Sequence, residues 1–350
     1  MSRISAKSLY IFLWLLLPVA VFTGLNTGAV EIPFDLIIIK TVRTVGDLLF
    51  LSSSNEQNDQ IATIILDIRL PRVFLALFVG AILAISGAVM QGLFRNPLAA
   101  PSLIGVSSGA SVGASIVIVM LGGILQNHSM LGLSMVAVGA FFGSFLVTLL
   151  VYRLSTSELG TSVMTMLLAG IAVSALAGAI NSLLSYFADN EMLRQMSIWQ
   201  MGNLSTANWT RVGIIFTVAS VVLIYFPKES KALNAMLLGE SEARHLGIDV
   251  QKVKRKLILL TTLGIGASVA VAGMIGFVGL IVPHMVRILI GPDHRKLLPI
   301  SALTGGILLL IADTLSRVLI SPAELPTGII TALLGAPFFI ALLLQQRREI

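Results

Sequence analysis

Apolar residues form long runs along almost the whole chain, and most runs have the length of a membrane-spanning helix. A helix needs roughly 20 apolar residues to cross the hydrocarbon core of a bilayer. The pattern predicts ten spans, of which the eighth is short. They lie at about 8–28, 70–92, 102–122, 131–152, 162–187, 210–227, 256–275, 280–291, 297–318 and 328–345. The sequence therefore predicts an all-α polytopic membrane protein with a single transmembrane domain over residues 1–350.

A strongly polar segment, LLGESEARHLGIDVQKVKRK at 237–256, interrupts this pattern between the sixth and seventh spans. Its centre is acidic at the start and basic at the end, an order that suits the dipole of a short helix. Gly247 is placed to end this helix, and Asp249 is placed to cap the next one. Four basic residues are expected to anchor that next helix at the lipid headgroups: Lys252, Lys254, Arg255 and Lys256. The segment is interpreted as a docking surface for a soluble partner, with an ordinary amphipathic loop as the alternative.

The composition agrees with a membrane protein, because 56% of the residues are hydrophobic and only 11% are charged. A soluble domain would carry about 25% charged residues. An even number of spans places both termini on one side, and most of the 23 Lys and Arg residues then share that side with the polar segment. Cytoplasmic loops are enriched in Lys and Arg, so both termini are expected in the cytoplasm. The net charge of +6 is attributed to this bias and not to nucleic-acid binding.

Signs of catalytic or cofactor chemistry are few. The chain has no Cys, and its four His residues do not form a metal-ligand spacing. A phosphate-binding loop of the form GxxxxGK(S/T) is absent from the sequence, so nucleotide hydrolysis in the usual way is not expected. We therefore expect no enzymatic activity, no metal site and no cofactor bound by this chain. The energy for any transport would come from another subunit or from an ion gradient.

Asp313 is the clear acidic candidate for ion coupling within the predicted spans, and Arg317 follows it by one helical turn. An acid and a base at positions i and i+4 favour an ion pair on one face of a helix. A paired acid indicates a structural or interfacial role. An ion-coupled secondary transporter is therefore kept only as an alternative.

Three arginines fall on the outer side of this topology, against the general bias, and they are Arg69, Arg72 and Arg317. Arginine makes strong bidentate hydrogen bonds with carboxylates, so an acidic soluble partner that arrives from outside is one explanation. The other explanation is that the side chains extend to the lipid headgroups.

Glycine is frequent, with 31 residues, and recurs at a spacing of four. The third span carries Gly105, Gly109 and Gly113, and the fourth carries Gly139 and Gly143. Small residues at this spacing let helix backbones approach closely inside a membrane. The pattern predicts a compact helical bundle.

Four long segments carry a resemblance to a known family. They are RLPRVFLALFVGAILAISGAVMQGLFRNPLAAPSLIGVSSGA from Arg69, LLGESEARHLGIDV from Leu237, GMIGFVGLIVPHMVRILIGPDHR from Gly273 and ADTLSRVLISPAELPTGIITALLGAPFF from Ala312. Together they resemble the permease subunits of binding-protein-dependent ABC importers for ferric siderophores, heme and vitamin B12. The resemblance implies the type II ABC importer permease fold and a homodimer in the lipid of the bacterial inner membrane. It also implies two cytoplasmic ATPase subunits that use ATP and one periplasmic substrate-binding protein.

The resemblance further implies roles for individual residues. A cytoplasmic coupling segment at about 228–252 would meet the ATPase. The residues that match the coupling helix are Gly239, Glu240, Ser241, Glu242, Ala243, Arg244, His245, Leu246 and Gly247. Arg69, Arg72 and Arg317 match arginines that meet acidic residues of the binding protein. Ser162 and Thr165 are the candidates for a translocation gate at the start of the fifth span.

The cargo is inferred from the same resemblance. The segment LLAGIAVSALAGAINSLLSYFADNEMLRQMSIWQMGNLS and the C-terminal part of the chain look most like heme permeases. Heme is therefore favoured over a ferric siderophore, and cobalamin comes third. The implied direction of transport is from the periplasmic side into the cytoplasm.

Overall fold

The computed structural model describes residues 5–28, 60–125, 129–158 and 160–347. The helices before the hairpin are α1 (Ala6–Asn26), α3 (Gln60–Thr63), the π-helix η1 (Ile64–Arg69), α4 (Leu70–Leu93), the 3-10 helix η2 (Pro101–Ile104), α5 (Val106–Leu125) and α6 (Ser129–Leu154). The helices after it are α7 (Val163–Phe187), α8 (Asn190–Gln200), α9 (Trp209–Lys228), α10 (Ser230–Leu238), α11 (Glu240–His245), α12 (Val250–Ala272), α13 (Val278–Ile290), α14 (His294–Val318) and α15 (Thr327–Arg347). The antiparallel hairpin between α6 and α7 consists of β1 (Thr156–Ser157) and β2 (Gly160–Thr161).

Each of the ten predicted spans coincides with a helix of the structure. Among the described residues, seven helices are long and apolar enough to cross a bilayer, and three further apolar helices are shorter. The eighth span corresponds to α13, which has 13 residues. At a rise of 1.5 Å per residue this helix is about 20 Å long, which is less than the ~30 Å thickness of the hydrocarbon core. The expectation of a short eighth span is confirmed.

The structure adds details that the apolar pattern did not contain. Helix α12 begins at Val250, about two turns before the predicted span, because the side chain of Asp249 accepts a hydrogen bond from the Lys252 backbone N–H at 3.0 Å and caps it. Helix α8 is amphipathic and was not predicted, and the side chain of Asp189 caps its first turn. The third predicted span is divided into η2 and α5 at Gly105, whose φ is 81°.

Helix α4 lies at the centre of the bundle, and 83% of the most apolar 18-residue stretch within Gln60–Leu93 is buried. It packs against α9, α12, α13 and α14, and Gly80 is where it crosses α14. A Cβ atom on Gly80 would lie only 2.3 Å from the backbone oxygen of Gly305. The glycines of the predicted third and fourth spans also lie at a close crossing, as expected for a compact bundle, since a Cβ on Gly113 would lie 2.0 Å from the Gly139 oxygen. Such distances mean that only glycine fits at these crossings.

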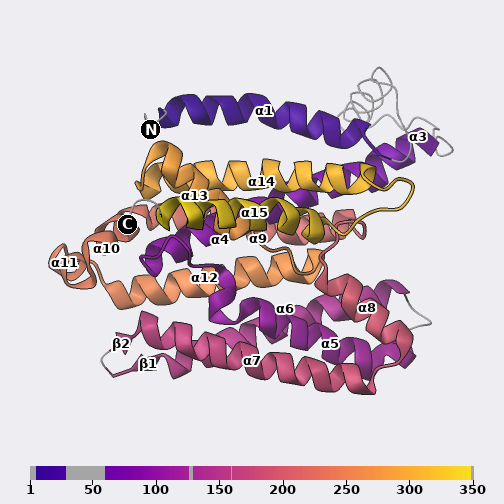
Figure 1. Cartoon of the computed structure of the whole chain (residues 1–350), viewed down its shortest axis with the longest axis horizontal. Helices are drawn as coiled ribbons and strands as arrows, with labels where there is room; N and C mark the ends of the chain where they lie inside the picture. Colours follow the sequence, from indigo (N-terminus) through magenta and orange to yellow (C-terminus); the bar gives the residue numbers. More distant parts are fainter. Residues whose placement is uncertain (1–4, 29–59, 126–128, 159, 348–350) are drawn as a thin grey trace, which may run out of the picture.

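The helices of the bundle run roughly side by side across the view in Figure 1. The start of α1, the end of α15, helices α10 and α11 and the β1–β2 hairpin all lie at one end of the molecule (Figure 1). Helices α3 and α8 lie at the opposite end. The polar segment and the hairpin before α7 are neighbours in space, since Lys254 of the segment donates a hydrogen bond to the backbone oxygen of Thr161.

The outer helices expose large apolar side chains. Leu15 of α1 is 70% exposed, Leu146 of α6 is 62% exposed and Met164 of α7 is 69% exposed. A soluble protein keeps such contiguous apolar surfaces small. Together with the ten apolar helices, these surfaces identify a multi-pass membrane protein.

Candidate functional site

The centre of the polar segment forms the predicted short helix, α11. Gly239 precedes it with a φ of 139°, and Gly247 follows it with a φ of 80°. Both angles lie in the region that glycine adopts most readily. The backbone N–H of Gly247 donates to the Arg244 oxygen at 2.9 Å and thereby ends the helix, as predicted from the glycine position.

Helix α11 turns most of its predicted coupling residues toward solvent. The exposed ones are Ser241, Glu242, Arg244, His245, Leu246 and Gly247. Gly239 and Glu240 are partly buried, and Ala243 is fully buried as the residue on which the helix rests. Leu238 and Leu246 flank the helix and are 71% and 65% exposed. Exposed leucines beside charged residues suit a protein docking surface, and contact with an ATPase stays a prediction.

Lys254 does not lie at the lipid headgroups, so that part of the expectation for the four basic residues is wrong. Its side chain is only 2% exposed. The ammonium group lies 2.6 Å from a carboxylate oxygen of Glu240 in α11 and donates to the backbone oxygen of Thr161 at 2.8 Å. The sequence carried a signal for this burial, because Lys254 lies four residues after the buried Val250 and four before the buried Ile258, on one face of a helix.

The β1–β2 hairpin packs against the first turns of α12. The side-chain oxygen of Gln251 accepts a hydrogen bond from the Thr161 backbone N–H at 3.0 Å, so both backbone groups of Thr161 are held by α12. Gly160 has a φ of 109°, and a Cβ there would lie 2.3 Å from the Gln251 amide. The hairpin is therefore fixed closely to α12 just before α7 begins.

The two predicted gate residues lie directly after this hairpin, in the first turn of α7. The hydroxyl of Ser162 accepts a hydrogen bond from the Thr165 backbone N–H at 3.3 Å and caps the helix. Both side chains are exposed at the same end of the molecule as α11. The structure therefore brings the two candidates together, and their role as a gate stays a prediction.

A second connection joins α10 to the start of α14. The side-chain oxygen of Asn234 accepts a hydrogen bond from the His294 backbone N–H at 2.9 Å and lies 2.8 Å from Nδ1 of the same residue. Its amide nitrogen donates to Asp293 at 2.7 Å. This hydrogen bond, together with the adjacent basic residues, holds the pKa of Asp293 below its ordinary value of 3.8. His294 is fully buried here, and Asn234 was not singled out from the sequence.

Two of the three outer arginines, Arg72 and Arg317, bind Asp313 at the end of the bundle away from α11. Nε of Arg72 donates to both carboxylate oxygens of Asp313 at 3.0 Å. Arg317 lies 3.4 Å from the same carboxylate, so the predicted i,i+4 ion pair is confirmed. Arg69 donates instead to the backbone oxygens of Leu25 and Asn26 at 2.5 and 2.8 Å. Asp313 is fully buried and serves as the shared anion of a structural network.

The arginine side chains are only 5% exposed and face the interior of the protein, which does not fit extension to lipid headgroups. Arg317 also donates to the backbone oxygens of Gly24 and Thr27 at 2.8 Å. Arg72 donates to Glu324 at 2.8 Å, and the Glu324 side chain is 38% exposed. Glu324 is thus the acid through which this network reaches the surface. Docking of a partner at these arginines stays a prediction.

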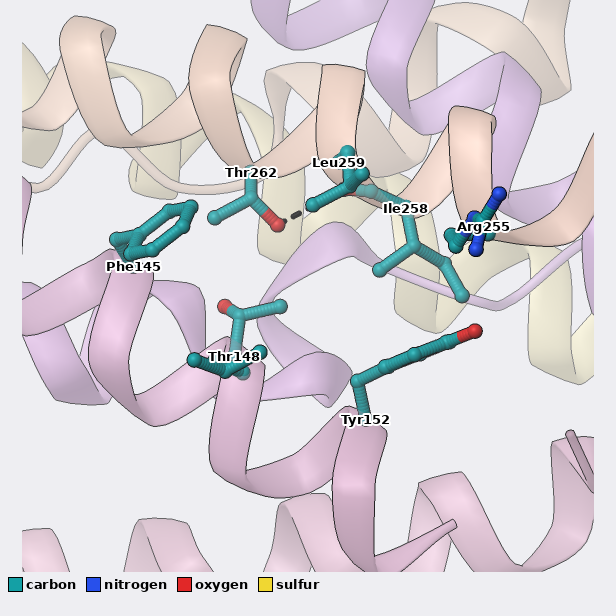
Figure 2. A pocket seen from close by; sticks show the side chains of 8 residues that line it. Phe145, Thr148, Tyr152, Arg255, Ile258, Leu259 and Thr262 are labelled. Atoms are coloured by element: carbon teal, nitrogen blue, oxygen red, sulfur yellow. Dashed lines mark hydrogen bonds between the residues drawn. The ribbon is translucent and has the colours of Figure 1, made fainter. Parts of the chain in front are cut away.

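A cavity of about 180 Å³ lies between α6 and α12, near the α11 end of both helices. Its walls are almost entirely apolar, and they include Phe145 and Tyr152 from α6 and Leu259 and Thr262 from α12. Figure 2 shows Arg255 and Tyr152 at one end of the cavity and Phe145 with Thr262 at the other. The cavity therefore has one end marked by a cation and a phenol and one apolar end.

Comparison with known proteins agrees with the helical bundle. The sequence matches the FecCD transport family over residues 16–345, which is almost the entire chain. This protein belongs to the FecCD transport family and is an ABC transporter permease.

Two relatives are similar over most of their length. The hemin transport system permease protein HmuU of Yersinia pestis is 43% identical over 348 residues, covering 99% of this chain and 98% of the relative. The cobalamin import system permease protein BtuC of Halobacterium salinarum is 47% identical over 279 residues, covering 79% of this chain and 72% of the relative.

Solved structures give the same fold. A metal-chelate type ABC transporter in an inward-facing conformation has a TM-score of 0.79 and 34% identity, covering 97% of this chain and 99% of that one. PsaBC from Streptococcus pneumoniae has a TM-score of 0.54 at 19% identity and shows a likeness of fold alone. The predicted type II ABC importer permease fold is confirmed.

Proposed function

We propose that this chain is the permease subunit of an importer that carries heme into the cytoplasm. The observation that supports heme most strongly is the end-to-end match to a hemin permease, over 99% of this chain and 98% of the relative. The cobalamin permease of Halobacterium salinarum is slightly more identical, but the match covers only 72% of its length. A ferric siderophore is the second candidate cargo, and cobalamin is the third.

The proposed assembly contains two copies of this chain, two ATPase subunits and one substrate-binding protein. Helix α7 supports the second copy, because it leaves a long apolar face uncovered, including Met164, Leu168 and Ile171, each at least 60% exposed. ATP would be bound and hydrolysed by the ATPase subunits, and this chain would hold no cofactor. The membrane would be the bacterial inner membrane.

The end of the molecule that carries α11 and both chain ends is proposed to face the cytoplasm. Lys and Arg are enriched in cytoplasmic loops, and Arg244, Lys252 and Arg255 all lie at this end. The ATPase would then contact the exposed surface of α11. The opposite end, with the arginine network around Asp313, would face the periplasm.

Docking of the binding protein at the arginine network requires an exchange of partners. Arg72 and Arg317 already hold Asp313, Glu324 and backbone oxygens. An incoming carboxylate would take the place of Glu324 on Arg72, since Glu324 is the partly exposed acceptor of the network. Arginine suits such an exchange because its guanidinium group can bind a carboxylate with two parallel hydrogen bonds.

The proposed mechanism is alternating access. Binding of ATP closes the ATPase pair and displaces α11, and the two permease copies open toward the periplasm to accept heme from the binding protein. Release of the nucleotide products reverses the movement and opens the path to the cytoplasm. Ser162 and Thr165, at the start of α7, are proposed as the gate on the cytoplasmic side.

The test is uptake into proteoliposomes that contain this chain with its cognate ATPase and, inside or outside the vesicle, the binding protein. Heme, a ferric siderophore and cobalamin are offered in separate assays with and without ATP. The proposal predicts uptake of heme that requires ATP and the binding protein. Uptake of cobalamin without heme would overturn the cargo, and uptake independent of the ATPase would overturn the function.

A further inference from the structure

The ammonium group of Lys254 joins two parts of the molecule that are far apart in sequence. One is Glu240, the first residue of α11, at 2.6 Å. The other is the backbone oxygen of Thr161, at 2.8 Å, one residue before α7 is capped. A lysine ammonium has three donors and no acceptor, so it can hold a carboxylate and a carbonyl together.

Burial makes this connection stiff. Lys254 is 2% exposed, and a buried charge is costly unless it is paired and hydrogen-bonded. If α11 moved without the hairpin, the ammonium group would lose one of its two acceptors inside the protein. The cost of leaving this buried ammonium group with one acceptor therefore favours joint movement of Glu240, Lys254 and Thr161.

The hairpin transmits this restraint directly to α7. Gln251 holds the N–H of Thr161 while Lys254 holds its oxygen. The next residue, Ser162, donates its backbone N–H to the Ser155 oxygen at 2.9 Å and caps α7. Few covalent bonds and no mobile linker separate the restrained peptide from the first turn of the helix.

We infer that Lys254 is a positioning residue that couples displacement of α11 to displacement of the start of α7. The inference rests on the proposed function, since it assigns a path by which force from an ATPase reaches the translocation pathway. Lys254 contacts neither the nucleotide nor the cargo. It acts by keeping Glu240 and Thr161 at a fixed separation.

The test compares Lys254→Met with Lys252→Met in the reconstituted importer. Lys252 is on the same helix, but its side chain is 76% exposed, and within the described part of the chain its ion pair is with Asp249. Methionine keeps most of the length of lysine and removes the charge, and Glu240 is 26% exposed and can be solvated. The quantities measured are ATPase binding, ATP hydrolysis and molecules of heme taken up per ATP.

The inference predicts that Lys254→Met still binds the ATPase and hydrolyses ATP, while uptake per ATP falls about tenfold, in the range typical of coupling between sites. Lys252→Met should match the wild type. If the wild type shows ATP-driven uptake and Lys254→Met takes up as much heme per ATP as the wild type, the inference is wrong and the proposed function is unaffected. Absence of ATP-driven uptake in the wild type would instead overturn the proposed function. Hydrogen exchange of the hairpin amides at residues 156, 157, 160 and 161 tests the contact of Lys254 with Thr161 without a transport assay. The exchange rate should rise in Lys254→Met and not in Lys252→Met.

The cavity between α6 and α12 carries a second, independent inference. Arg255 at its polar end is exposed, and among the described residues no carboxylate forms an ion pair with it. The cavity extends from Arg255 to Thr262, which is about 10 Å along a helix. Leu259, on its rim, is 48% exposed.

This arrangement matches the two parts of a phospholipid. A cation at the membrane surface attracts an anionic headgroup, and the apolar cavity beneath it can take part of an acyl chain. We propose that the cavity binds an anionic glycerophospholipid, with its phosphate at Arg255 and one chain beside Leu259. Tyr152 lies at the same end as Arg255 (Figure 2), where an amphipathic ring suits the headgroup level.

The test is native mass spectrometry of the purified protein with phosphatidylglycerol or phosphatidylcholine. The proposal predicts that phosphatidylglycerol is retained and phosphatidylcholine is not. Retention should be lost in Arg255→Gln and in Leu259→Trp, which fills the cavity, and kept in the control Lys252→Gln. The proposal is wrong if both lipids are retained equally or if the two cavity variants retain phosphatidylglycerol as the wild type does. It is also wrong if Leu259→Trp loses dimers in place of lipid.

Discussion

Gly87 of α4 lies against the backbone of Gly279 of α13, so closely that a Cβ atom on Gly87 would lie 1.7 Å from the Gly279 carbonyl oxygen. The contact holds the short helix α13 against the centre of the bundle. A backbone carbonyl cannot move aside as a flexible side chain can. The crossing therefore depends on glycine at position 87.

Gly87→Ala is expected to destabilise the protein strongly. Overpacking of a tight core usually costs about 1–3 kcal/mol, and a clash with a backbone atom belongs at the upper end of that range. The measurement is the Tm of the purified protein in detergent. Gly213→Ala is the matched control, because a Cβ on Gly213 of α9 meets no atom within 4 Å, and its Tm should be equal or higher. Equal Tm values for Gly87→Ala and the wild type would contradict this packing.

Asp313→Asn is expected to destabilise the outer end of the bundle. The substitution leaves the buried guanidinium groups of Arg72 and Arg317 without their shared anion, and removal of one partner from a buried ion pair costs about 3–5 kcal/mol. The measurement is again the Tm in detergent. Glu191→Gln, which removes the exposed ion pair of Glu191 with Arg194 on α8, should leave the Tm unchanged. A comparable Tm for both variants would show that Asp313 is not a structural anion.

Glu324→Gln tests whether the outer arginines receive a partner. Because Glu324 occupies Arg72 in the free protein, weakening this acceptor should free Arg72 for a carboxylate of the binding protein. Docking affinity is expected to rise about fivefold, which corresponds to about 1 kcal/mol, and to fall with added salt. The measurement is the affinity of the binding protein for the immobilised permease by surface plasmon resonance, at low and at high salt. Weaker docking in Glu324→Gln would mean that Glu324 itself contacts the partner.

The spans, the tight glycine crossings and the helix at 240–245 could be predicted from the sequence, because each depends on local composition or on a short repeat. Lengths of apolar runs give spans directly, and a glycine after a charged turn ends a short helix. The fold as a whole followed from the family resemblance, since hydropathy alone does not specify which helices touch.

Partners that are distant in sequence could not be predicted in the same way. The spacing of Lys254 from Val250 and Ile258 indicates a buried face, but its partners Glu240 and Thr161 follow only from the packing of α11 and the hairpin against α12. The burial of Arg69 and Arg317 likewise depends on backbone oxygens at the end of α1. No side-chain pattern reports a backbone acceptor more than 40 residues away, as in the pair of Arg69 and Asn26.

Asp293→Asn gives a prediction about pH. The pKa of Asp293 is lowered in the folded protein, first by the hydrogen bond from Asn234. A lowered pKa means that the ionised group stabilises the fold at pH values above 3.8, its ordinary value, and that this stability is lost as pH falls through the lower folded value. Asp293→Asn should therefore lower the Tm at pH 7, and the difference from the wild type should shrink below pH 4. A difference that does not depend on pH would contradict a charged hydrogen bond.

The coupling role of α11 is tested most directly by reversing two of its exposed charges together, in Glu242→Lys with Arg244→Glu. Neither side chain supports the fold from within, since Ala243 is the buried residue of this helix. The measurement is ATP-driven uptake in proteoliposomes together with co-purification of the ATPase. The account predicts that both are lost while the Tm of the isolated permease is kept. Retained co-purification and retained uptake would contradict the claim that α11 connects this permease to its source of energy.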